Sequence, residues 1–160
     1  MPPDRPDTFA GPPASLVFLL SKLGFAASQS FAATLEPLGL EPRHFAVLNY
    51  IALAEGHSQQ QLGSVLDIPA SRMVAIVDEL EDRDIVERRA NPTDRRARAL
   101  YLTPAGKALL RKARTAVRAN ETKFCATLAP GIREQLIELL TPLAQAHDVA
   151  SVHPQLTTTS

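Results

Sequence analysis

The sequence is poor in several residue types, and each shortage excludes a class of protein. It has one cysteine, Cys125, so neither an internal disulfide nor a cysteine-based zinc site is possible. It has no tryptophan and only two tyrosines, which disfavours a stacking platform for single-stranded nucleic acid. The longest apolar run, Leu16–Leu20, is far shorter than the roughly 20 residues of a membrane span. We therefore expect a cytoplasmic protein with no membrane partner.

Motifs of catalysis and cofactor binding are missing as well. The sequence has no glycine-rich phosphate loop and no nucleophile-elbow serine. The histidines are too scattered to suggest a zinc site; they are His44, His57, His147 and His153. We predict that the protein is not an enzyme and has neither a metal nor another cofactor.

What the sequence does contain is an uneven distribution of charge around a formal net charge of zero. Residues 83–118 hold eleven basic and three acidic residues, a net +8, whereas residues 36–82 hold two basic and eight acidic residues, a net −6. A basic segment in a neutral protein predicts a local patch for a polyanion. The charges of Lys107–Arg118 also fit a solvated helix without a partner. The better candidates for binding a polyanion are the arginines that flank turn residues: Arg88, Arg89, Arg95, Arg96 and Arg98.

Apolar periodicity predicts a mainly helical chain. Ser15–Pro37 is apolar on more than one side, so this helix needs a partner, most easily a second chain. A second helix is predicted at Pro42–Ala54. Ser58 and Gln61 form a capping box that opens a short helix, and a further helix ends near Asp82. Two short helices joined by a tight turn form a helix-turn-helix, although this signal alone is weak.

Two strand-like runs follow, Ile85–Arg89 and Arg98–Leu102, and the residues between them have turn chemistry. A basic hairpin directly after a helix-turn-helix indicates a winged helix. Thr103 then caps a helix expected to reach about Leu128, and a last helix is predicted at Ile132–Ala146, which Pro142 should kink or shorten.

These elements divide the chain into four predicted parts. Residues 1–14 form a flexible arm, and residues 41–103 form a winged helix-turn-helix domain for DNA binding. Residues 15–40 and 104–150 form a helical dimerisation region, and residues 151–160 form a flexible tail. The predicted fold class is mainly α with a small β-hairpin wing, plus N- and C-terminal dimerisation helices.

The most specific pattern in the chain is Val77–Arg88, followed by Asn91–Arg96 and Leu102–Gly106. On these residues, and from about Leu16 to Leu143, the sequence resembles the MarR family of bacterial winged-helix regulators. The resemblance implies a homodimer whose terminal helices interleave and which binds a pseudo-palindromic site in double-stranded DNA, usually as a repressor. It also implies release of DNA when a small aromatic or phenolic anion binds. Two recognition helices would then lie roughly 34–36 Å apart.

The resemblance places the DNA contacts on the recognition helix and the wing. Arg72 is the candidate for a guanine contact, with an ion pair to an acidic neighbour as the alternative. Positions 74 and 75 are commonly polar or basic in relatives, so Val74 and Ala75 predict sparse direct base readout. The predicted DNA-binding residues are Ser58, Gln60, Ser71, Arg72, Val74, Ala75, Arg88, Asp94, Arg95, Arg96 and Arg98.

Within the wing, Arg95 and Arg96 are predicted to reach the minor groove or its phosphates, with Asp94 bracing an arginine. Gln61 fits either a phosphate contact or its capping box. Asp84 replaces the glycine usual before the wing in the family, which predicts a positive φ at this position.

The effector region of relatives corresponds here to Ser28, Phe31, Arg43, His44 and Tyr50. An arginine and a histidine near apolar walls suit a carboxylate, with Tyr50 as a hydrogen-bond partner. The alternative is that Arg43 and His44 lie on the outer face of a helix start.

Three further alternatives stay open. Cys125 is interpreted as a buried structural thiol, with a redox switch as the alternative. Instead of a specific regulator, the chain fits a ligand-sensing dimeric scaffold for a protein partner. It also fits an architectural DNA binder with little sequence preference.

Overall fold

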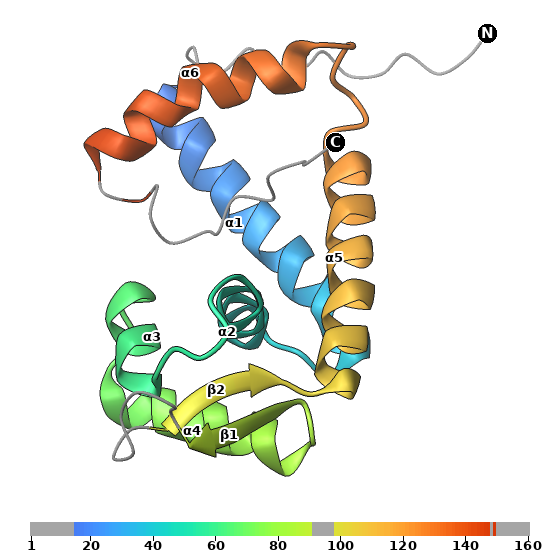
Figure 1. Ribbon diagram of the computed structural model, residues 1–160. Coiled ribbons are helices and arrows are strands. Elements are labelled where there is room, and N and C mark those ends of the chain that lie inside the picture. The colour runs from blue at the N-terminus through green and yellow to red at the C-terminus, as the bar shows by residue number, and fades with distance from the viewer. Residues whose placement is uncertain (1–14, 91–97, 148, 150–160) are drawn as a thin grey trace, which may run out of the picture.

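The computed structural model describes residues 15–90, 98–147 and 149, and within them it confirms a mainly helical chain with one β-hairpin (Figure 1). The elements in chain order are α1 (Leu16–Leu35), the short 3-10 helix η1 (Glu36–Leu38), α2 (Pro42–Leu53), α3 (Gln59–Val65), α4 (Ala70–Asp82), β1 (Val86–Ala90), β2 (Arg98–Leu102), α5 (Pro104–Phe124) and α6 (Ile132–Ala146). The predicted arm and tail, residues 1–14 and 151–160, lie outside the described residues.

Local sequence explains where several of these helices begin. The Ser58 side chain accepts a hydrogen bond from the Gln61 amide at 3.3 Å, and the Ser58 amide donates to the Gln61 side chain at 2.8 Å. This confirms the capping box, which satisfies amides that the helix itself leaves unpaired. Thr103 caps α5 in the same way by accepting from the Gly106 amide at 2.9 Å.

The winged helix is built around one buried cluster that α2, α3, α4 and the hairpin share. Met73, Val77 and Leu80 of α4 are fully buried, as is Leu48 of α2. The strands pair antiparallel, with Val86 opposite Leu102. Because apolar residues recur at helical spacing on α4, one face is held in this core and the opposite face is left to solvent.

The long helix α5 connects this domain to the other end of the molecule. It packs along both α1 and α2. The Ser30 hydroxyl donates to Asn120 at 2.6 Å, and the Arg114 guanidinium donates to the buried Asn49 side chain at 2.8 Å. In Figure 1, the N-terminal half of α1 and all of α6 lie at the end opposite α3, α4 and the hairpin.

That opposite end carries many exposed large apolar side chains. They are Leu16, Val17, Phe18, Leu19, Leu23 and Phe25 on α1, and Leu136, Ile137, Leu139, Leu140 and Leu143 on α6. Moreover, the segment Leu16–Leu38 is long and apolar enough, by length and composition alone, to cross a membrane. The short uninterrupted run seen in the sequence therefore understated how apolar this segment is.

Two details of the C-terminal half correct the sequence predictions. Helix α5 ends at Phe124 rather than near Leu128, so Cys125 lies at its C-terminal cap and is half-buried rather than fully buried. Helix α6 continues through Pro142 to Ala146, so of the two expected effects, a kink or a shorter helix, the shortening does not occur. A proline removes one hydrogen bond of the helix, and the neighbouring turns on both sides maintain the rest.

Candidate nucleic-acid interface

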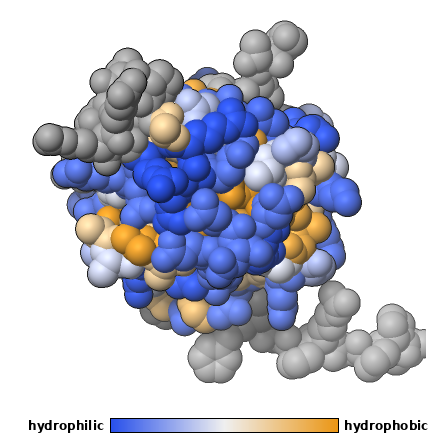
Figure 2. Space-filling view, turned by 60° about the horizontal axis from the view of Figure 1, so that its bottom comes forward, coloured by the Kyte–Doolittle hydropathy of each residue, from blue (hydrophilic) through white to orange (hydrophobic). Residues whose placement is uncertain are grey.

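The first half of α4 presents exposed side chains next to the hairpin. Ser71, Arg72, Val74 and Ala75 are exposed, whereas Met73 between them is buried. The surface on this side of the molecule is largely hydrophilic, with small apolar patches (Figure 2). This face combines a helix N-terminus, whose free amides favour anions, with exposed polar and methyl groups.

The turn before α4 fixes how this helix leaves α3. Asp67 has a φ of +51°, and a Cβ at Gly63 would lie 3.1 Å from the Ile68 carbonyl oxygen. A glycine at this position therefore allows the two helices of the helix-turn-helix to approach closely.

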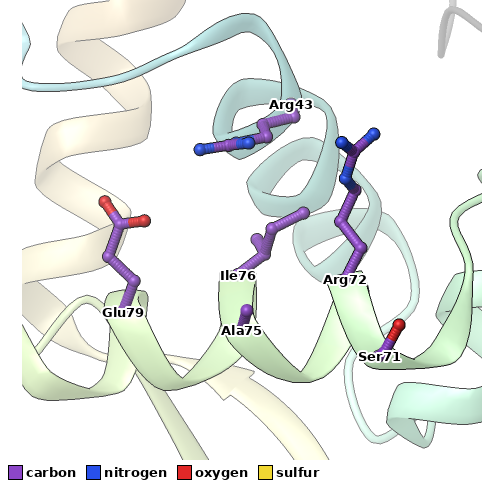
Figure 3. Close-up of a pocket in the computed structure, with 6 residues that line it drawn as sticks. All are labelled: Arg43, Ser71, Arg72, Ala75, Ile76 and Glu79. Atoms are coloured by element: carbon purple, nitrogen blue, oxygen red, sulfur yellow. The ribbon is translucent and has the colours of Figure 1, made fainter.

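Arg72 makes no ion pair in the part of the chain that the structure describes, so the alternative of a pairing with an acidic neighbour is not observed. It lines a cleft of about 310 Å³ together with Arg43 of α2 and Glu79 (Figure 3). Arg43 pairs with Glu41 at 3.0 Å. Arg72 therefore keeps its charge available at the edge of the exposed face.

Arg88, which the sequence predicted to contact DNA, is engaged in hydrogen bonds within the chain. Its guanidinium donates to Glu81, to Asp78 at 2.5 Å and to the Gln59 side chain at 3.0 Å. Its side chain is only 18% exposed. The guanidinium is thus engaged by partners of its own chain at the surface where β1, α4 and α3 meet.

The other predicted DNA-contact residues differ in exposure and in whether their side chains are already hydrogen-bonded. The Ser58 hydroxyl and the Gln61 side chain are engaged in the capping box, whereas Gln60 is exposed. Arg98 is exposed at the start of β2. The predicted wing residues Asp94, Arg95 and Arg96 lie outside the described residues.

The base of the wing holds two residues that the sequence singled out. Arg89, a member of the predicted basic patch, stacks over the Tyr101 ring at 4.5 Å and pairs with Glu87. Asp84 has a φ of +55°, as predicted for the position before the wing. The Thr103 hydroxyl donates to the Asp84 carbonyl at 2.6 Å and so secures this turn against the start of α5.

The five predicted effector residues do not gather in one cavity of the described structure. Ser28 is exposed on α1, Phe31 packs edge-on against Phe45, and Tyr50 packs edge-on against His57. Arg43 lines the cleft with Arg72. His44 instead lines a separate cleft of about 540 Å³, between α1, the start of α2 and α4.

His44 is buried, which corrects the alternative that placed it on an outer helix face. Its Nδ1 accepts a hydrogen bond from the Glu41 amide at 3.2 Å. Its Nε2 lies 3.2 Å from a Glu79 carboxylate oxygen without being aligned for a hydrogen bond. Burial lowers the pKa of His44 below its ordinary value, although Glu79 and Glu41 oppose this effect.

Comparison with known proteins fits this geometry. The family model of the MarR family matches residues 38–97. A transcriptional regulatory protein for the hcr operon of Thauera aromatica is 35% identical over 126 residues, which cover 78% of this chain and 76% of that protein. The chain belongs to the MarR family.

Solved structures of MarR-family relatives have the same architecture. The transcriptional repressor CouR, bound to a 23-mer DNA duplex, has a TM-score of 0.73 and 29% identity, covering 81% of this chain and 92% of CouR. CouR from Rhodococcus jostii RHA1 has also been solved with p-coumaroyl-CoA. Rv2887 of Mycobacterium tuberculosis, solved with salicylic acid, has a TM-score of 0.65 and 28% identity, covering 82% of this chain and 97% of Rv2887. These relatives confirm a winged-helix fold of the MarR type.

Proposed function

We propose that this protein is a homodimeric transcriptional regulator that binds a pseudo-palindromic operator and acts as a repressor in the cytoplasm. The observation that carries the proposal is the exposed N-terminal half of α4 beside the hairpin, with Arg72 unpaired within the described chain. An exposed helix of this kind fits the major groove, where an arginine can donate two hydrogen bonds to guanine.

The base readout in this proposal is sparse. Ser71 and the amides of the first turn of α4 bind a phosphate, and Val74 and Ala75 contact thymine methyl groups. Gln60, Arg98 and the wing arginines Arg95 and Arg96 supply the remaining contacts, mainly to phosphates. Phosphate contacts position the protein on DNA without reading sequence, so Arg72 carries much of the discrimination between bases.

The dimer forms through the exposed apolar side chains of α1 and α6. A second copy of the chain suits these faces better than a bilayer does, because the C-terminal half of α1 is already packed in its own chain. Ser30 is bonded to Asn120 of α5, and Phe31 packs against Phe45 of α2. A two-fold dimer would bury both apolar helices and place two winged helices on one side.

The effector in this proposal is an aromatic carboxylate or its coenzyme A thioester. The support comes from the relatives, since Rv2887 has been solved with salicylic acid and CouR with p-coumaroyl-CoA. In this chain, His44 and Arg43 line neighbouring clefts on either side of Glu79. A ligand that binds in either cleft would contact α4 directly and so change the position of the recognition helix.

The test is fluorescence anisotropy with the full chain and labelled DNA from upstream of its own gene, compared with scrambled DNA at two salt concentrations. Arg72→Ala should weaken binding to the specific DNA about 10- to 100-fold and change binding to scrambled DNA much less. Arg118→Ala, on the exposed surface of α5, is the matched control. Equal binding of both DNAs would indicate an architectural binder, and no binding to either would favour a scaffold for a protein partner.

A further inference from the structure

Arg88 of β1 connects three elements of the winged helix through one guanidinium. Its side chain donates to Asp78 and Glu81 of α4 and to Gln59 of α3, and its backbone amide donates to Glu81 at 3.2 Å. Charge-assisted hydrogen bonds to carboxylates are stronger than neutral ones, and several of them from one planar guanidinium fix its orientation. Beside the shared apolar core, the strand that leads into the wing is therefore joined to the polar flank of the recognition helix through Arg88.

The carboxylates that pair with Arg88 belong to an acidic stretch of α4, which is unusual for a helix proposed to approach DNA. The second half of α4 is acidic; its carboxylates are Asp78, Glu79, Glu81 and Asp82. Glu79 faces His44 and Arg83, at 3.2 Å and 3.6 Å, on the other flank of the helix. Unpaired carboxylates would be repelled by a phosphate backbone, so pairing on both flanks of α4 reduces the repulsion between this helix and DNA.

The surroundings of Arg88 favour a permanent pairing. Burial lowers the pKa of its guanidinium, but the hydrogen bonds to Asp78 and Glu81 outweigh this and keep the pKa above its ordinary value. The same hydrogen bonds leave the arginine little freedom to turn outward.

We infer that Arg88 is a positioning residue: it neutralises Asp78 and Glu81 and attaches the wing to the recognition helix in the DNA-binding orientation. This inference depends on the proposed function, because it assumes that α4 enters DNA. It assigns to Arg88 a role different from the direct DNA contact that the sequence predicted.

A mutant cycle separates the two roles. It compares four proteins: the wild type, Arg88→Met, Asp78→Asn with Glu81→Gln, and all three changes together. If Arg88 is a brace, Arg88→Met exposes two unpaired carboxylates and weakens operator binding at least tenfold. The triple variant then recovers most of that affinity, because no carboxylate is left to pair, and the effects are strongly non-additive.

A direct phosphate contact gives a different pattern. The effects of the Arg88 change and of the two carboxylate changes on the free energy of operator binding would add. Replacing the carboxylates would then change the affinity equally with and without Arg88. The slope of log affinity against log salt would fall by about 0.9 in Arg88→Met. That pattern would overturn the inference. Arg118→Met serves as the control for removal of one exposed arginine.

Two further outcomes are covered by the same experiment. If thermal melting shows that Arg88→Met does not fold, Arg88→Lys replaces it in the cycle. A lysine keeps the charge for a phosphate but cannot hold three partners in a fixed fork, so a brace predicts weaker operator binding and a direct phosphate contact predicts nearly unchanged binding. Wild-type protein without operator preference would overturn both the proposed function and this inference, whereas selective binding with an additive cycle would overturn the inference alone.

Discussion

At the scale of single residues, His44 connects the start of α2 to the recognition helix. Because the Glu41 amide donates to Nδ1, this nitrogen is unprotonated and the imidazole carries its proton on Nε2, facing Glu79. Protonation of Nδ1 would place two donors against each other and would remove the contact that holds the Glu41 amide. The neutral imidazole is therefore the form that the fold requires.

This requirement gives a pH dependence of stability with a defined sign. The pKa of His44 in the folded protein lies below the ordinary value of 6.5, because burial disfavours the charged form. The unfolded chain then binds the proton more readily, so the contribution of His44 is fully present above pH 6.5 and is lost as the pH falls from 6.5 through the lower pKa of the folded protein. We expect the free energy of unfolding, measured by urea titration at about pH 7.5, 6.5 and 5.5, to fall on acidification.

The variant His44→Asn isolates this contribution from the titration of other groups. An asparagine can still accept from the Glu41 amide but does not titrate, so the decrease in stability between about pH 7.5 and 5.5 should be smaller than in the wild type. His147→Asn changes an exposed histidine and controls for the removal of a histidine as such. An equal decrease in wild type and His44→Asn would show that His44 does not contribute.

At the scale of elements, the sequence predicted best what neighbouring residues decide. The capping box of Ser58 and Gln61 and the cap of Thr103 involve residues three apart, and their patterns are visible in the chain. The positive φ of Asp84 was predicted from the family pattern, because a left-handed turn there normally requires glycine. The hairpin followed from two short strand-like runs around turn residues.

The sequence could not predict features that depend on residues distant in the chain. Arg88 of β1 pairs with Asp78 and Glu81 of α4. From composition alone, this arginine was assigned to a basic patch. His44 is buried and faces Glu79, which is 35 residues away in the chain, so no local pattern indicates its surroundings. The end of α5 at Phe124 was also missed, since apolar residues continue beyond it to Leu128.

The wing is the element whose contribution to binding is predicted from charge alone. Replacement of Arg95 and Arg96 together by alanine should weaken binding to all DNA sequences and reduce the slope of log affinity against log salt by about 0.9 for each phosphate that is no longer neutralised. The measurement is anisotropy over a salt series with specific and scrambled DNA. Arg118→Ala with Lys123→Ala removes the same charge from α5 and should leave the slope close to the wild-type value. Unchanged affinity in the wing variant would remove the wing from the interface.

At the scale of the whole molecule, the chain has two ends with opposite surface chemistry. One end holds the recognition helix and the hairpin on a hydrophilic face, and the other holds the exposed apolar side chains of α1 and α6 (Figures 1 and 2). Exposed apolar area of this extent is unusual on a monomer and is typical of an interface. In the proposed dimer, the distance between the two recognition helices is thus set by side chains far from DNA.

This arrangement predicts that operator binding can be abolished without changing the DNA face. Leu139 of α6 is 74% exposed in the isolated chain, so Leu139→Glu should leave the fold of the monomer intact but place a charge in the apolar interface. We expect sedimentation equilibrium to show a dimer for the wild type and a monomer for the variant. Operator affinity should fall by at least a hundredfold, because each winged helix would then bind its half-site independently.

Leu53 provides the matched control, since it is 68% exposed but lies at the end of α2 rather than on α1 or α6. Leu53→Glu adds the same charge and should remain dimeric with nearly wild-type operator affinity. A dimeric Leu139→Glu protein would place the interface elsewhere on the chain. A monomeric variant with unchanged operator affinity would mean that the two half-sites are bound independently even in the wild type, because dimerisation would then contribute nothing to recognition.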